Sequence, residues 1–523
     1  MAVSDEFESR TRSFLDPIHG LIRLTELEVV VVDHPLFQRL RHIKQNGLLQ
    51  YVFPGATHSR FEHSLGVLYV AHGMLNSLTL NSSVGATKQC VADIASARDG
   101  EAVLFAKPQT EEWTFAYRIV RLAALVHDLG HGPLSHTFDR FAPARKLTGD
   151  LLASDHLKAL WSIKTQLLEV GKDHKEKPEH YKNTRTPHEV VSCILFAKIA
   201  RDVHIDERTV RAVVGVITGI YLQDDGTTCS IDPKYRALLP LLHDIIASAP
   251  ADADRMDYME RDSRSIGVTY GLFDRNRVLK SLLCYQTETA QGKQLRLGIK
   301  LSGLKAIENL LQARYELFAQ VYYHKTNHAI SRMLDRLSKN ANTEPALDLF
   351  GDVDSVQSLE TTYCELTDEV FVRRLSGRAT ELSPSATPVA RIINDIITRN
   401  LWKRVLDSTT RMEADEISSE LRSLYPADAE NIVVDETKPK ALKELNDGAA
   451  LLVRNEDGIY QQGLARHWTD ESTIIEALDR ADGAAARIYF DGMNPIRWKE
   501  IRDSAQKLIV KRRRQMFKPQ SAT

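Results

Sequence analysis

Apolar residues recur at helical spacing through most of the first 345 residues of the chain. Leu36, Leu40 and Ile43, for example, fall on one side of a helix. Beyond residue 345 the pattern changes, because residues 449–453 and 485–490 are short apolar runs typical of strands, and a turn sequence follows the first of them. The pattern therefore predicts a mainly α-helical protein with a smaller α/β C-terminal region.

We accordingly predict two parts, a helical domain over residues 1–345 and an α/β region over residues 346–523. Two segments interrupt the helical pattern. Residues of about 83–112 are rich in Ser, Ala, Thr and Asp, and residues 139–187 are polar and rich in lysine, so we interpret both as insertions. The chain ends in a basic run that begins KRRR, which is usually a solvated end but could contact phosphates.

The most informative stretch is residues 122–136, LAALVHDLGHGPLSH. Its first five residues are too uniformly apolar for a surface helix and predict the end of a buried helix. His127 and Asp128 follow directly, and Pro133 prevents the helix from continuing. An imidazole and a carboxylate are costly to bury without partners, and a metal ion offers a partner to both. The alternative is a histidine that caps the helix beside a surface aspartate, but this alternative explains His131 and His136 poorly.

Composition narrows the class of protein. Among 523 residues, 26% are charged and 43% are hydrophobic, as in ordinary globular proteins, and the net charge of −2 gives no general attraction to nucleic acid or membranes. The five cysteines include no CxxC pair, which argues for a reducing compartment and against a thiolate metal site. The first residues are polar, and no apolar run is long enough to span a membrane. We expect a soluble, cytoplasmic protein without a membrane partner.

Other polar residues lie on predicted helices that otherwise serve a core. Asp254, Tyr258 and Asp262 share one helical face because they are spaced by four, and this face suits a binding wall better than packing. A long helix predicted over residues 302–337 places Arg314 and Lys325 on one side with two aromatic rings between them. A surface stripe of cations is the alternative for this helix.

Four polar residues lack a structural reason for their positions: His63, His127, Asp128 and Asp254. Two imidazoles and two carboxylates suit a divalent ion such as Fe, Mn, Mg, Zn or Ni, whose identity the residues do not decide. Four protein ligands on such an ion leave positions for water and for a substrate oxygen. These residues therefore predict a hydrolytic metal site.

The order of these ligands resembles the H…HD…D pattern of the HD-domain phosphohydrolases. The surrounding motifs DPIHG, FQRLR, YVFPGA, SRFEHSLGV, HDLGHGPLSH and DRMDYMERD look like one branch, the deoxynucleoside triphosphate (dNTP) triphosphohydrolases. The likeness covers residues of about 13–340 and includes enzymes in which a sterile-alpha-motif domain precedes the HD domain. We expect no such domain before the HD region here.

The resemblance implies roles for individual residues. His63, His127, Asp128 and Asp254 would hold the metal, and His131, His136 and His188 would line the α-phosphate as catalytic residues. The residues implied to contact phosphates, sugar and 3′-hydroxyl are Arg60, Tyr258, Asp262, Arg314, Tyr322 and Lys325. We expect Asp33, Gln38 and Arg41 to form a polar stripe on one helix. They match the family's activating nucleotide pocket, which forms where subunits meet.

The implied reaction is metal-dependent hydrolysis of a dNTP to a deoxynucleoside and tripolyphosphate. We choose His136 as the acid that protonates the leaving 5′-oxygen, with His131 polarising or relaying. The resemblance also implies a homo-oligomer, a tetramer in our interpretation, activated by GTP or a dNTP. The biological role could be the balance of dNTP pools or antiviral defence by starving phage.

Two alternatives stay open. One is a catalytically weak nucleotide sensor or nucleic-acid-binding protein that retains the fold, with RNA or single-stranded DNA binding through the basic tail as a secondary property. The other is a different HD phosphodiesterase, but the HHExxDGxGYP and HDxxED blocks of two such groups do not occur in the sequence.

Overall fold

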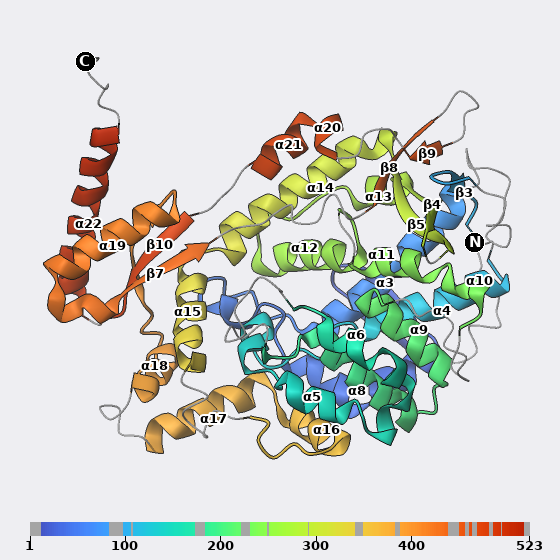
Figure 1. Cartoon of the computed structure of the whole chain (residues 1–523), viewed down its shortest axis with the longest axis horizontal. Coiled ribbons are helices and arrows are strands. Elements are labelled where there is room, and N and C mark those ends of the chain that lie inside the picture. Colours follow the sequence, from blue (N-terminus) through green and yellow to red (C-terminus); the bar gives the residue numbers. More distant parts are fainter. Residues whose placement is uncertain are drawn as a thin grey trace.

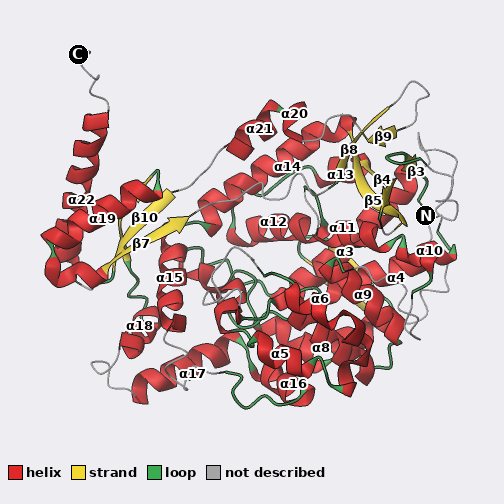
Figure 2. Ribbon diagram, in the orientation of Figure 1, coloured by secondary structure: helices red, strands yellow, loops and turns green. Residues whose placement is uncertain are grey.

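The computed structural model describes residues 12–82, 98–105, 108–172, 184–220, 231–247, 250–290, 292–339, 349–381, 388–437, 449–454, 460–462, 468–480, 485–492 and 494–516. Helices dominate this part of the chain, and the strands form three small sheets (Figure 1). Figure 2 shows the same predominance of helix over strand. The predicted fold class, mainly α with a smaller α/β region, is confirmed.

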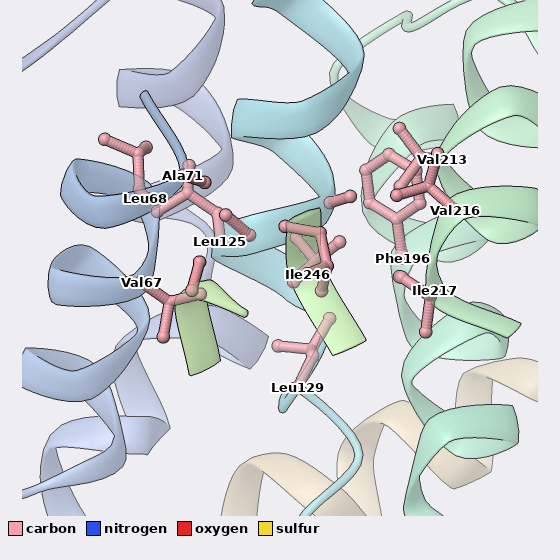
Figure 3. Packing of buried hydrophobic residues seen from close by; sticks show 14 of the residues in the cluster. Val67, Leu68, Ala71, Leu125, Leu129, Phe196, Val213, Val216, Ile217 and Ile246 are labelled. Carbon is pink, nitrogen blue, oxygen red and sulfur yellow. The ribbon is translucent and has the colours of Figure 1, made fainter. Parts of the chain in front are cut away.

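Six helices pack around the main hydrophobic core. They are α3 (Arg60–Ser82), α4 (Glu111–Val126), α8 (His188–Asp202), α9 (Glu207–Thr218), α11 (Leu239–Ala247) and α12 (Ala253–Ile266). Figure 3 shows Leu68 of α3, Leu125 of α4, Phe196 of α8 and Ile246 of α11, all fully buried, at their meeting point. Every residue from Ile119 to the end of α4 is buried, so the prediction of a buried helix that ends before His127 is confirmed.

The N-terminal part forms a hairpin and several short helices against this core. These elements are β1 (Arg12–Asp16), β2 (Gly20–Leu24), α1 (Glu26–Asp33), α2 (Pro35–Gln38) and the 3-10 helices η2 (Arg39–His42) and η3 (Gly47–Tyr51). Thr25 caps α1 through a capping box with Glu28, and His34 and Pro35 separate α1 from α2. The polar stripe around Gln38 therefore lies on several short helices.

The predicted insertion over residues 139–187 contains ordered helices. They are η5 (Ser135–Phe141), α5 (Arg145–Leu151), η6 (Asp155–Ile163) and α6 (Lys164–Glu169). Leu151, Leu160 and Leu167 from these elements are buried in the main core. Although the segment is rich in lysine, these apolar residues anchor it to the core. Residues 83–97 and 173–183, which form most of the other insertion and the rest of this one, lie outside the described residues.

A five-stranded sheet of order β3-β4-β5-β8-β9 lies beside the helical core. Its strands are β3 (Ala102–Val103), β4 (Leu282–Thr289), β5 (Gly292–Lys300), β8 (Ala450–Arg454) and β9 (Tyr460–Gln462), and the short helices α10 (Pro233–Arg236) and α13 (Arg275–Ser281) lie near it. β8 is parallel to β5, so chain from beyond residue 345 completes a sheet that the first part begins. The division at residue 345 stays a prediction. The turn predicted after β8 lies outside the described residues.

The long helix predicted over residues 302–337 is broken. The chain forms η7 (Leu301–Gly303), α14 (Leu304–Leu317), a π-helical turn η8 (Phe318–Tyr322) and then α15 (Lys325–Lys339) in another direction (Figure 1). A π-turn adds a residue to the helical repeat, so spacing by four no longer keeps side chains on one stripe. The prediction of a single helix was therefore wrong.

The remaining elements lie toward the C-terminus. They are α16 (Val356–Glu365), α17 (Asp368–Glu381), α18 (Pro388–Ile397), β6 (Lys403–Ser408), α19 (Arg411–Leu424), η10 (Pro426–Asn431), β7 (Ile432–Thr437), α20 (Trp468–Glu471), α21 (Thr473–Arg480), β10 (Ala485–Phe490) and α22 (Pro495–Met516). The antiparallel sheet β6-β10-β7 packs with α19 and α22 around a second hydrophobic core. β8 and β10 confirm both strands predicted for this region. Among the described residues, no helix is both long and apolar enough to cross a membrane.

Candidate active site

The site begins with the two residues that directly follow the buried helix α4, His127 and Asp128. His127 places Nδ1 2.8 Å from the carbonyl oxygen of Ala124. A carbonyl can only accept a hydrogen bond, so Nδ1 carries the proton and the lone pair is on Nε2. Nε2 of His127 is buried without a hydrogen-bond partner. Such a nitrogen is available to a metal ion.

The loop after Asp128 is fixed against α8. The backbone N–H of Gly130 donates to the hydroxyl of Ser192 at 2.7 Å, and that hydroxyl donates to the carbonyl of His127 at 2.7 Å. A Cβ at Gly130 would lie 2.1 Å from the carbonyl oxygen of His188, so only glycine fits this contact. The first glycine of the HDLGHG motif thus brings α8, and His188 with it, against the loop.

His63 on α3 faces His127 across the site, with ring centroids 5.5 Å apart. Its Nδ1 lies 2.8 Å from Oδ2 of Asp257, and its Nε2 lies 3.0 Å from Oδ1 of Asp254. Burial lowers the pKa of His63, but the carboxylates of Asp254 and Asp257 outweigh this effect and raise the pKa to about 10. The surrounding negative charge therefore favours a cation bound to this imidazole, either a proton or a metal ion.

The donor set fits a divalent metal. Ligand atoms of His63, His127 and Asp254 lie within 4.8 Å of one another. The carboxylate of Asp128 lies 3.4 Å from Nε2 of both histidines. Burial raises the pKa of Asp128, but Arg60, His127 and His131 outweigh burial and hold the pKa well below its ordinary value, so Asp128 is an anion. The two Nε2 atoms form no hydrogen bonds, so both can coordinate an ion without losing one.

Asp257 positions His63 from behind. One carboxylate oxygen accepts the Nδ1 proton of His63, and the other lies 2.6 Å from Nε2 of His19, while Arg261 donates to both. Nδ1 of His19 lies 2.8 Å from the guanidinium of Arg275, which can only donate, so His19 donates to Asp257 through Nε2. A carboxylate behind a ligating histidine fixes its tautomer and orientation.

We predict that Asp257→Asn weakens metal binding by about 10–100-fold, because the amide no longer requires a proton on Nδ1 of His63. The measurement is metal occupancy by elemental analysis after competition with a chelator. Asp244→Asn is the matched control, since Asp244 is also buried and paired with an arginine, Arg296, but contacts no site residue. Equal loss of metal in both variants would contradict this role of Asp257.

A second cluster adjoins the first. The ligand-type atoms of His131, His136, Asp139 and His188 lie within 4.8 Å of one another. The His131 and His188 rings are stacked 3.7 Å apart, and the His136 ring lies 4.7 Å from that of His131. The structure thus brings together all three histidines predicted to be catalytic. Their catalytic role stays a prediction.

These histidines differ in protonation. Burial, Arg60 and His188 hold the pKa of His131 well below its ordinary value, so this imidazole is neutral. Desolvation lowers the pKa of His136, but the carboxylate of Asp139, 3.5 Å from Nδ1, outweighs it and raises the pKa. The side chain of His136 is 69% accessible to solvent. Between His131 and His136, His136 is the histidine better able to hold a proton within reach of a ligand.

Three of the predicted substrate-binding residues meet on α12 and η8. Tyr322 donates its hydroxyl proton to Asp262, and the rings of Tyr258 and Tyr322 lie 6.3 Å apart. His58 lies 2.7 Å from the other oxygen of Asp262. Burial and the nearby Asp262 raise the pKa of Tyr322 well above its ordinary value, so the hydroxyl keeps its proton.

The three predicted cations occupy different environments. Arg60 is buried and donates to Asp128 and to the hydroxyl of Ser135, so it is directed at a proposed metal ligand. Arg314 lies near the end of α14 with its guanidinium 5.2 Å from the ring centroid of Phe318. Lys325 begins α15 and is exposed. The break at residues 323–324 separates Lys325 from the helix that carries Arg314.

The predicted activator residues lie together but on separate elements. Asp33 ends α1 and accepts from Arg12, Gln38 ends α2, and Arg41 belongs to η2. Nε of Arg41 donates to the side chain of Gln38 at 2.9 Å. The expectation that they share one helix was wrong, because His34 is extended and Pro35 starts a new helix.

Several residues of the site were not assigned from the sequence. Besides Asp257 and His19, these are Arg39, His58 and Asp139. Arg39, buried, donates to the carbonyls of Leu129 and His131 and so braces the loop. The motifs DPIHG, FQRLR and DRMDYMERD contain three of the five, but long-range pairing such as His19 with Asp257 leaves no spacing signal in the chain.

The chain is similar to known proteins over much of its length, although no family model matches it. It is 29% identical to the deoxynucleoside triphosphate triphosphohydrolase SAMHD1 of Gallus gallus over 415 residues. This alignment covers 77% of this chain and 57% of that protein. The Homo sapiens protein of that name is 28% identical over 406 residues, 75% of this chain and 54% of that one. The uncharacterized protein YwfO of Bacillus subtilis is 27% identical over 335 residues, 64% of this chain and 56% of that one.

The fold is also found in a solved structure. A hypothetical protein from Aquifex aeolicus superposes with a TM-score of 0.58 at 23% identity, over 95% of this chain and 100% of that one. The chain spans little more than half the length of the curated relatives described above. The donor set of His63, His127 and Asp254 makes this site a candidate divalent-metal centre. The sequence relatives confirm the resemblance to the HD-domain dNTP triphosphohydrolase family.

Proposed function

We propose that the protein is a metal-dependent dNTP triphosphohydrolase that releases a deoxynucleoside and inorganic tripolyphosphate. The observation that carries this proposal is the position of Asp128 between the two clusters. One of its oxygens lies 3.4 Å from Nε2 of His63, and the other lies 3.4 Å from Nε2 of both His127 and His131. A metal held by the first cluster would thus adjoin histidines that can bind and protonate a phosphate ester.

In the proposed mechanism, water adds to the α-phosphorus as the bond to the 5′-oxygen breaks. A divalent ion held by His63, His127, Asp128 and Asp254 would supply water activation and offset phosphoryl charge. His131, which is neutral, can donate one hydrogen bond to an α-phosphate oxygen. His136, whose pKa Asp139 raises, donates its proton to the leaving 5′-oxygen. The products are then a deoxynucleoside with a neutral 5′-hydroxyl and tripolyphosphate, and the proton that the attacking water loses restores the protonated His136.

The proposed substrate contacts follow from the same geometry. Arg314 and Lys325 would bind the triphosphate by charge-assisted hydrogen bonds. Asp262, which holds the Tyr322 hydroxyl, would accept from the 3′-hydroxyl, and the ring of Tyr322 would exclude a 2′-hydroxyl. Tyr258 would pack against the sugar.

The test is incubation of the purified protein with each dNTP singly and in mixtures, with Mn²⁺ or Mg²⁺, and product analysis by ion chromatography. Deoxynucleoside and tripolyphosphate in equal amounts are expected. Release of pyrophosphate or monophosphate would show a different HD phosphodiesterase reaction. Nucleotide binding without turnover in every mixture would show a nucleotide sensor.

We further propose a homo-oligomer, a tetramer, activated by GTP or a dNTP bound at Asp33, Gln38 and Arg41. A carboxylate can accept two hydrogen bonds from a guanine edge, and Arg12 already occupies Asp33 in the single chain, so the nucleotide would compete with an ion pair. A ligand shifts assembly only by binding one state better than another.

We predict that Asp33→Ala abolishes activation and nucleotide-dependent assembly but retains the basal rate. Sedimentation and turnover are measured with and without GTP and each dNTP. Glu26→Ala, an exposed carboxylate at the start of the same helix, is the control and is expected to behave as wild type. Unchanged activation in Asp33→Ala would show that the activator binds at another site.

A further inference from the structure

The C-terminal sheet β6-β10-β7 has two faces with different partners. Ala486, Ile488 and Phe490 of β10 belong to the second core with α19 and α22. Side chains alternate along a strand, so Arg487 and Tyr489 point to the opposite face. That face meets α15, which stands between the sheet and the helical core (Figure 1).

The two outward residues of β10 hold the backbone of residues 322–325. NH1 of Arg487 donates to the carbonyl of Tyr323 at 2.6 Å, and the fully buried Tyr489 donates its hydroxyl to the carbonyl of Lys325 at 3.0 Å. This segment is the break between η8 and α15, and it carries Tyr322 and Lys325 at its two ends. The carbonyls that end a helix lack intrahelical partners, so side-chain donors, Arg487 for Tyr323 and Asn327 for Tyr322, help to set the conformation of this segment.

A chain of ion pairs connects the same face to the catalytic turn η5. Asp435 of β7, the cross-strand partner of Arg487, lies 2.8 Å from Nε of Arg332 on α15. NH1 of Arg332 donates to Asp335 at 2.6 Å, and Asp335 lies 2.8 Å from NH2 of Arg140. Arg140 lies on η5, which also carries His136 and Asp139.

We infer that the C-terminal sheet contributes to the active site. Arg487 and Tyr489 are positioning residues for residues 322–325, the segment that carries the proposed substrate-binding residues Tyr322 and Lys325. The inference rests on the proposed function for its substrate. The sheet fixes the carbonyls of Tyr323 and Lys325, and this places the Lys325 ammonium and the Tyr322 ring relative to Asp262. Loss of either donor frees the segment while the hydrophobic core of the sheet stays intact.

The test uses Tyr489→Phe and Arg487→Met, each of which removes one donor. Tyr425→Phe is the matched control, because its hydroxyl also bonds within the C-terminal region, 2.7 Å from that of Ser504 on α22, and touches no part of α15. KM and kcat for each dNTP, the melting temperature, and hydrogen–deuterium exchange of the peptide covering residues 318–329 are measured. Arg487→Lys, which keeps a cationic donor, tests rescue.

We expect KM to rise about fivefold in Tyr489→Phe and Arg487→Met, the loss of one hydrogen bond, with kcat within about twofold of wild type. Exchange at 318–329 should accelerate in both, Arg487→Lys should recover, and Tyr425→Phe should lower only the melting temperature. Unchanged KM, with or without a fall in apparent kcat that matches the loss of folded protein, would overturn the inference. An inactive wild type would refute the proposed function instead, and the exchange result would still decide whether the sheet fixes this segment.

Discussion

Asp128→Ala is expected to abolish dNTP hydrolysis and to remove bound metal. Among the residues that the structure describes, Asp128 is the carboxylate that contacts both clusters, 3.4 Å from Nε2 of His63, His127 and His131. Its pKa is held well below the ordinary value, so it supplies a full negative charge among buried histidines. Without that charge a metal would have Asp254 as its only proposed anionic ligand, and Arg60 would be left buried without a carboxylate partner.

The measurements for Asp128 are turnover with Mn²⁺ and metal content by elemental analysis. Asp128→Asn keeps the size of the side chain and an acceptor for Arg60, so it separates the charge from the packing. Both variants are expected to be inactive and metal-poor, whereas Asp244→Asn should retain both properties. Full metal content in Asp128→Asn would show that Asp128 acts on the substrate side and is not a ligand.

Much of the fold followed from the sequence because its signals are local. The unbroken apolar run before His127 requires burial on all sides, and the structure places that run at the centre of the helical core. The alternating residues 485–490 predict a strand, and their register in β10 even separates the two faces of the sheet. The broken helix at residues 318–325 could not be predicted, because a π-turn leaves no change in apolar spacing that distinguishes it from a continuous helix.

The proposed metal donors stand out in the sequence because each is a polar residue at the end of a helix that otherwise serves the core. His63 and Asp254 lie on the first turns of α3 and α12, and His127 is the residue directly after α4. The residues that support these donors were harder to identify from the sequence, because Asp257 looks like any charged residue on a polar helix. Its role exists only in three dimensions, where His19 and His63, 44 residues apart, bind its two oxygens. Residues that support a ligand through tertiary contacts therefore need the structure.

His136→Ala is expected to keep the metal and to lower kcat by about 10²–10⁴, the usual contribution of a positioned proton donor. His136 is not among the residues that converge on Nε2 of His63 and His127, so metal occupancy should not change. Asp139→Asn should retain more activity and change the pH profile. The Asp139 carboxylate raises the pKa of His136, so its loss lowers that pKa, and the alkaline limb of kcat/KM should move to lower pH.

The control for His136 is His204→Asn, which changes an exposed histidine on another loop and should leave rate and profile unaltered. The decisive comparison is metal content against rate. His136 belongs to a four-residue group that also includes His131, Asp139 and His188, and such a group could itself hold an ion. If His136→Ala lost metal in proportion to its rate, His136 would be a ligand, and the leaving-group proton would have to come from another residue. Retention of metal with a reduced rate assigns the proton to His136, because Asp139 raises the pKa of its ring and the ring is accessible to a ligand.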